Sequence, residues 1–82
     1  MKNITDAVVE KLCKYMGQKN FTQYRLAEKS GLPFSTVKSI MQKKTKNISL
    51  KTVICLCKGL EVPLAEFLDD KTFSHDNLNF DA

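Results

Sequence analysis

Hydrophobic residues recur along most of this chain at the three- and four-residue spacing of an α-helix, and no stretch of any length alternates like a strand. The first apolar stripe ends near Gly17, and Asn3 or Thr5 is a suitable N-cap at its start. Its members are Ile4, Val8, Val9, Leu12, Cys13 and Met16. The spacing predicts an amphipathic first helix that buries this stripe.

Capping residues mark a short second helix over residues 23–29. Thr22 is a suitable N-cap, and Leu26 and Ala27 would face inward. Gly31 stands where a left-handed residue closes a helix. These signals predict a helix that ends in a tight turn.

A third helix is predicted to begin after Pro33, because proline pre-sets φ for the first helical turn. Val37 and Ile40 would face inward, together with Met41. The residues left outside are Phe34, Ser35, Lys38, Ser39 and Gln42. This helix therefore has one apolar side and one polar side.

The second and third predicted helices have the pattern of a helix-turn-helix, in which two short helices are joined by a glycine-containing turn. Ala27 is small, so the helices can cross closely, and Gly31 supplies a positive φ without steric cost. Leu26, Val37 and Ile40 would hold the two helices at a fixed angle. The outer face of the third helix would then be presented to a DNA major groove.

Two more helices complete the pattern. Ser49 is a good N-cap for a fourth helix that stops at Gly59, and Pro63 opens a short fifth helix. The core stripe of the fourth helix would be Leu50, Val53, Ile54 and Cys57, and the fifth would contribute Leu64, Phe67 and Leu68. The 82 residues allow one domain, which we place at residues 1–68, followed by an acidic C-terminal tail at residues 69–82.

Charge is distributed unevenly about the net value of +4. Between Lys11 and Lys58, ten lysines and one arginine stand against a single acid, Glu28, whereas from Gly59 onward one lysine stands against six acids. The asymmetry indicates a basic face and an acidic tail held away from it. A basic face suits nucleic acid or an anionic membrane surface, although lysines that only confer solubility are the alternative.

Other functional classes find little support in the composition. The cysteines Cys13, Cys55 and Cys57 lack disulfide or zinc spacing, so we expect buried free thiols in a reducing compartment. His75 is the single histidine, and no set of four metal ligands is present. No nucleophile, base and acid converge, so we expect no enzymatic activity, cofactor, metal or small-molecule ligand. No apolar run is long enough for a bilayer and no secretory signal is visible, so a cytoplasmic protein is expected.

The run from Thr22 to Ile40, TQYRLAEKSGLPFSTVKSI, resembles the Xre-type helix-turn-helix family, the phage repressor and Cro-like proteins. The resemblance continues through residues 44–47, 49–53 and 60–68, and so covers about residues 4–68. It implies an all-α, compact five-helix lambda-repressor-like DNA-binding domain whose second and third helices form the helix-turn-helix. Such domains usually bind DNA as symmetric dimers.

The resemblance also implies roles for individual residues. Gln23 would contact a phosphate and brace the recognition helix. The base-reading positions would be Phe34, Ser35, Lys38 and Ser39. The phosphate-contacting positions would be Thr22, Gln23, Lys44, Thr45, Lys46 and Asn47.

The chemistry of these side chains suits the roles to different degrees. Ser35 and Ser39 can donate or accept at base edges, and Lys38 can reach guanine O6 and N7 or a phosphate. Phe34 has no hydrogen-bonding group, so it would meet a thymine methyl group or a sugar, or else pack on the turn. The loop lysines suit phosphate contacts that carry no sequence information. Arg25 and Lys29, both outward on the second helix, could add such contacts or be solvated charges.

Three positions depart from the family pattern. Met41 stands where many relatives have a glutamate, and we expect it in the core. Lys43 stands where relatives often have glycine, and a left-handed conformation there would cost about 1 kcal/mol. Pro33 replaces the usual N-cap serine or threonine, which removes a capping oxygen.

Together these features predict a sequence-specific double-stranded DNA-binding transcriptional regulator, a small phage-like or mobile-element repressor that binds an inverted-repeat operator as a homodimer. The dimer interface would come from Leu64, Phe67, Phe73, Leu78 and Phe80. The alternative is a protein-interaction module, such as an antitoxin subunit whose acidic tail folds on a partner protein. In a further reading, the tail is a frayed C-terminus. Non-specific binding to RNA or a membrane surface is disfavoured, because neither interleaved exposed aromatic residues nor a basic amphipathic helix is evident.

Overall fold

The computed structural model describes residues 3–78, and this part of the chain contains five α-helices and one short 3-10 helix. The α-helices are α1 (Ile4–Lys19), α2 (Gln23–Ser30), α3 (Phe34–Met41), α4 (Leu50–Leu60) and α5 (Leu64–Leu68). The 3-10 helix η1 spans Lys71–Phe73. The all-α helix-turn-helix fold expected from the sequence is confirmed. None of the described helices is long and apolar enough to cross a membrane.

The helices begin where their capping residues predict. Asn3 and Asp6 form a capping box at the start of α1. The hydroxyl groups of Thr22 and Ser49 accept hydrogen bonds from backbone N–H groups in the first turns of α2 and α4. The N-cap of α3 is Pro33, which makes no side-chain capping hydrogen bond because the proline ring has no oxygen atom to accept one.

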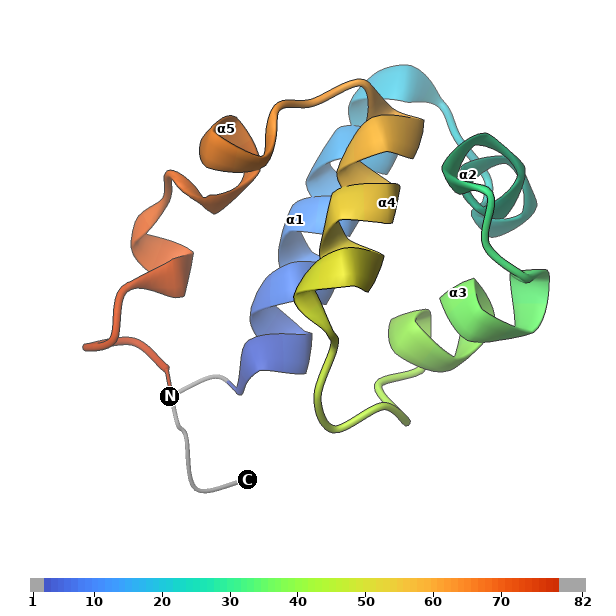
Figure 1. The fold of residues 1–82 in the computed structure, drawn as a ribbon. Helices are drawn as coiled ribbons and strands as arrows, with labels where there is room; N and C mark the ends of the chain where they lie inside the picture. The colour runs from blue at the N-terminus through green and yellow to red at the C-terminus, as the bar shows by residue number, and fades with distance from the viewer. Residues whose placement is uncertain (1–2, 79–82) are drawn as a thin grey trace.

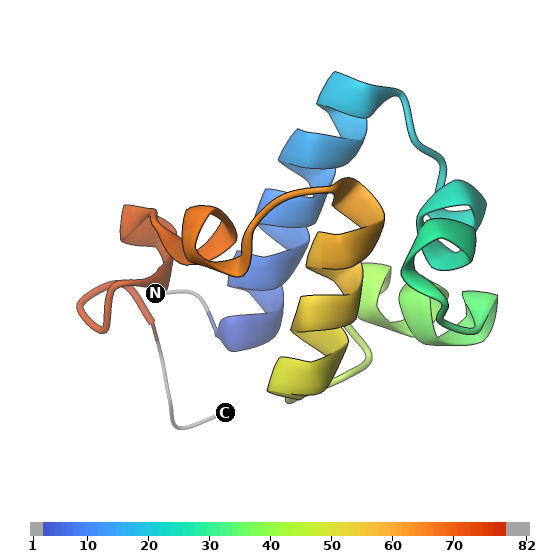
Figure 2. The same cartoon turned by 45° about the horizontal axis from the view of Figure 1, so that its top comes forward.

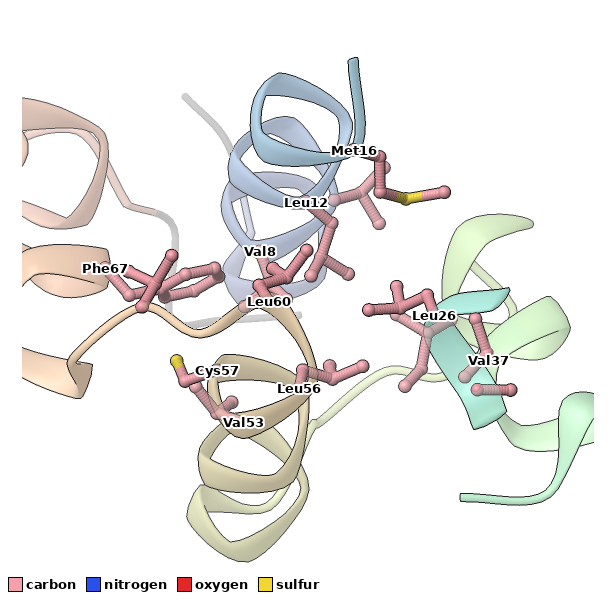
Figure 3. Close-up of a cluster of buried hydrophobic side chains, with 14 residues drawn as sticks. Val8, Leu12, Met16, Leu26, Val37, Val53, Leu56, Cys57, Leu60 and Phe67 are labelled. Atoms are coloured by element: carbon pink, nitrogen blue, oxygen red, sulfur yellow. The ribbon is translucent and has the colours of Figure 1, made fainter. Parts of the chain in front are cut away.

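Helices α1 and α4 occupy the centre of the molecule, with α2 and α3 on one side and α5 and η1 on the other (Figures 1 and 2). Figure 3 shows how side chains from these elements meet between them, with Leu56 of α4 directed toward Leu26 of α2. Leu12, Leu26, Leu56 and Leu60 are completely buried. The helix-turn-helix is therefore attached to the central helices by continuous apolar packing, which fixes its position.

The buried side of α4 differs from the predicted one. Leu50 and Ile54 are 61 % and 47 % exposed, so the prediction that they belong to the core is wrong. The buried side chains of α4 are those of Val53, Leu56, Cys57 and Leu60. Leu50 and Ile54 lie beside this stripe, and no element of residues 3–78 covers them.

The prediction that α4 stops at Gly59 is also wrong. The helix continues to Leu60 and ends at Glu61, whose φ of 59° is left-handed. Gly59 is buried against Ser30, and a Cβ atom there would lie 2.9 Å from the Ser30 backbone nitrogen and 3.1 Å from its Cα atom. Gly59 therefore lets α2 and α4 approach closely, which is a packing role rather than a terminating one.

The expectation of buried thiols holds for one of the three cysteines. Cys57 is buried, and burial raises the pKa of its thiol. Cys55 is half-buried and Cys13 is exposed. Cys13 was predicted to belong to the buried stripe of the first helix, and that prediction is wrong, because Cys13 is not among the buried residues of α1.

The segment after α5 packs on the central helices. Lys11 is only 4 % exposed and its Nζ atom lies 3.2 Å from Asp70 Oδ2. The Phe73 ring lies 5.9 Å from the buried Phe67 ring, measured between centroids. The acidic segment is therefore in contact with a lysine of the basic segment, and the expectation that it is held away is wrong at this position.

These contacts correct the predicted dimer interface. Phe67 and Leu78 are buried in the chain's own core, and Leu64 and Phe73 are half-buried against it. Phe80 lies outside the described residues. Burial leaves Phe67 and Leu78 unable to contact a second copy.

Candidate nucleic-acid interface

The third helix buries one side and exposes the other, as predicted. Val37 and Ile40 are 0 % and 2 % exposed and pack into the core. Of the predicted base-reading residues, Phe34, Ser35 and Lys38 are exposed, and Ser39 is half-buried. These four side chains therefore lie at or near the outer surface of α3.

A left-handed glycine forms the turn before α3. Gly31 has a φ of 69°, and the N–H of Leu32 donates to the Ala27 carbonyl oxygen at 3.1 Å. Leu32 then packs against the core, and Pro33, with a φ of −59°, begins the next helix. This turn sets the angle at which α3 leaves α2.

Gln42 is an exposed polar residue on the same side of α3 that was not included among the predicted base readers. It follows Lys38 by four residues and Ser35 by seven, which is the spacing of one helix face. Its amide can pair with both N6 and N7 of adenine in the major groove. Helical spacing places Gln42 on the outer side, but no base-reading role was assigned to it.

A buried threonine of α1 fastens the loop after α3. The Thr5 hydroxyl donates to the Thr45 carbonyl oxygen at 2.6 Å, and the Lys46 carbonyl oxygen is 3.1 Å from the same hydroxyl. Thr5 is 1 % exposed, whereas Lys44, Lys46 and Asn47 are exposed. The loop backbone is thus held against α1 while these side chains extend into solvent.

Lys43 connects α3 to this loop in a left-handed conformation, with a φ of 59°. Its N–H donates to the Ile40 carbonyl oxygen at 2.9 Å, and its Nζ atom lies 3.3 Å from Asp6 Oδ1. Lys43 therefore adopts the conformation whose cost for a residue other than glycine is about 1 kcal/mol. Met41 is half-buried and packs on the core, also as expected.

The N-terminus of α2 holds the remaining predicted phosphate contacts. Thr22 is exposed, and its hydroxyl oxygen accepts from the Arg25 N–H at 3.0 Å, which leaves the hydroxyl proton free to donate. Gln23 is half-buried. The Arg25 guanidinium lies 2.6 Å from Glu28 Oε1, so its charge is partly neutralised.

Ion pairs reduce the number of basic groups available to a ligand. Arg25 and the buried Lys11 each contact a carboxylate. By contrast, Lys38, Lys44 and Lys46 are exposed and pair with no acid among the residues that the structure describes. Exposed lysines without an acidic partner among the described residues are thus present on α3 and the loop that follows it, and also on α2 and α4, at Lys29, Lys51 and Lys58.

Helix α3 lies between α2 and the loop of residues 43–48 in both views (Figures 1 and 2). An exposed helix with short polar side chains, flanked by groups that bind phosphate, is the arrangement by which a helix-turn-helix enters a major groove. Phosphate contacts set the register, and side chains at base edges supply specificity.

A family model described as a Cro/C1-type HTH DNA-binding domain matches residues 11–72. This range includes α2, the turn, α3 and the loop that follows. Comparisons with curated proteins and with solved structures gave no match.

Proposed function

Because the chain belongs to the Cro/C1-type helix-turn-helix DNA-binding family, we propose that it is a sequence-specific transcriptional repressor of the phage or mobile-element kind. It would act in the cytoplasm by occupying an operator in double-stranded DNA and blocking a promoter. The observation that carries the proposal is an exposed polar face on α3 beside a loop that Thr5 anchors to α1. In this loop Lys44 and Lys46 are exposed and pair with no acid among the described residues.

The two groups of residues have different tasks in this proposal. Base reading belongs to the outer face of α3, formed by Phe34, Ser35, Lys38, Ser39 and Gln42. Phosphate binding belongs to Thr22 and Gln23 of α2 and to the loop residues Lys44, Thr45, Lys46 and Asn47. Because phosphate contacts release counterions, affinity should fall steeply with salt.

We further propose that the repressor is a homodimer. Leu50 and Ile54 are exposed apolar residues one turn apart on α4, and Leu68 of α5 is 38 % exposed. These side chains replace Phe67 and Leu78, which are buried. A two-fold dimer would place two recognition helices in major grooves about 34 Å apart, so the operator would be an inverted repeat.

Selection of bound duplexes from a random DNA library at about 150 mM salt tests the proposal. We expect an enriched inverted repeat whose half-sites are one helical turn apart. A single enriched half-site would contradict the dimer but retain sequence-specific binding. Folded protein that enriches no sequence would refute the proposal and favour the alternative, a module that binds a partner protein.

Two double variants separate the proposed tasks. Ser35→Ala with Ser39→Ala should reduce the preference for the selected sequence over random DNA. Lys44→Ala with Lys46→Ala should weaken all duplexes alike and lower the slope of log affinity against log salt by about 2, since each phosphate contact contributes about 0.9. Lys71→Ala is the control for loss of a positive charge as such, because it removes one lysine from η1, on the opposite side of the central helices (Figure 1), and should leave the slope unchanged. Equal losses of discrimination in both double variants would contradict the division.

A further inference from the structure

Two exposed aromatic rings meet across the helix-turn-helix. Tyr24 of α2 is 66 % exposed and Phe34, the first residue of α3, is 43 % exposed. Their ring centroids are 5.9 Å apart, with an angle of 49° between the ring planes. The contact therefore joins two side chains that remain largely open to solvent into one small apolar surface.

The backbone below Phe34 is held firmly. The Pro33 ring restricts φ to −59°, and the Pro33 carbonyl oxygen accepts from the N–H groups of Thr36 and Val37. Val37 is completely buried, so the first turn of α3 is anchored to the core. Tyr24 contacts one side of the Phe34 ring, so the ring is supported on that side by a side chain of α2.

A ring of this kind can recognise only an apolar group on DNA. Phenylalanine has no donor or acceptor for a base edge or a phosphate. The 5-methyl group of thymine is the apolar group that an unmodified base pair displays in the major groove. Exposed Ser35 and Lys38 lie next to Phe34 and one turn after it, so the ring is at the beginning of the face that would read bases.

We propose that the Phe34 ring, supported by Tyr24, recognises the 5-methyl group of one thymine in each half-site. This inference rests on the proposed function, because it requires that α3 enters the major groove. It adds a specificity determinant that is hydrophobic rather than hydrogen-bonded. Burial of one methyl group corresponds to about a fourfold change in affinity per half-site, and about fifteenfold when both half-sites are altered.

The test uses the whole protein and the duplex selected from the random library. Each thymine is replaced in turn by deoxyuridine, which removes the methyl group and leaves base pairing intact. We expect one position per half-site at which the replacement weakens binding about fourfold. At that position, Phe34→Ala should bind the thymine and deoxyuridine duplexes equally.

Two further variants separate recognition from structural support. Tyr24→Phe keeps the ring and should keep the preference for thymine, whereas Tyr24→Ala should reduce it by removing the support. If no thymine shows a methyl effect, or if Phe34→Ala retains the effect, the inference is refuted and Phe34 only packs on the turn. These outcomes differ from failure of the proposed function, in which no duplex would be selected at all and the inference would fall with it. The deoxyuridine series with the unaltered protein can refute the inference even if a variant does not fold.

Discussion

The close crossing of α2 and α4 depends on the absence of a side chain at Gly59, and Gly59→Ala tests this directly. The new Cβ atom would contact the Ser30 hydroxyl oxygen and would lie 2.9 Å and 3.1 Å from the Ser30 backbone nitrogen and Cα atom. The hydroxyl could rotate away, but the backbone of Ser30 cannot move without displacing the end of α2. The substitution should therefore push the helix-turn-helix away from α4.

Two opposing terms determine the size of the effect. Alanine is more favourable than glycine in a helix interior by about 0.8–1.0 kcal/mol. Overpacking of a tight interior contact typically costs about 1–3 kcal/mol, and the cost should be at or above the upper end here because the contact is with backbone. We expect a net loss of at least about 2 kcal/mol in the free energy of unfolding. For a domain of this size, about 2 kcal/mol corresponds to a Tm lower by about 8–16 °C.

Gly17→Ala is the matched control, because Gly17 also lies in a helix but has nothing within 4 Å of the position a Cβ would take. It should gain about 0.5–1 kcal/mol from helix propensity alone. Thermal and urea unfolding of the two variants, followed by circular dichroism, would measure the difference. If Gly59→Ala is as stable as Gly17→Ala, the helices are not in the close contact described and the reasoning is refuted.

Three further predictions concern buried or paired polar groups. Ser30 Oγ is buried without a hydrogen-bond partner among the described residues. Ser30→Ala should therefore raise the free energy of unfolding by about 1 kcal/mol, measured as a higher urea midpoint. An unchanged or lower midpoint would contradict this. The pKa of Asp70 is lowered to about 2 by hydrogen bonds from the Thr72 amide and hydroxyl and by Lys11. Asp70 therefore stabilises the fold above its unfolded pKa of about 3.9, and this stability should be lost as pH falls from about 4 to about 2. Asp70→Asn should flatten that part of the acid-unfolding curve, and a curve parallel to the wild type would show that the contact contributes nothing. In Thr5→Val the Thr45 carbonyl oxygen loses its donor, so the free energy of unfolding should fall by about 1–3 kcal/mol. Amide hydrogen exchange in residues 44–47 should become faster. Unchanged exchange would mean that other contacts hold the loop.

The start of most helices, and the helix-turn-helix itself, could be predicted because their signals are local. A threonine before α2 caps an N–H group three residues away, and Gly31 relieves the strain of a left-handed turn at its own position. The outward side of α3 follows equally from the spacing of Val37 and Ile40. In each case the physical cause lies within about one helical turn of the residue concerned.

What the sequence determined by itself was therefore the set of helices, their caps and the polar face of α3. Tertiary structure alone decided which apolar residues are covered: Ile54 remains exposed, whereas Lys11 is buried under the segment that carries Asp70. It also decided that Thr5 anchors a loop forty residues away. Helix periodicity defines a stripe but not which of its edges a neighbour covers, and burial depends on distant elements that share no local signal with the residues they cover.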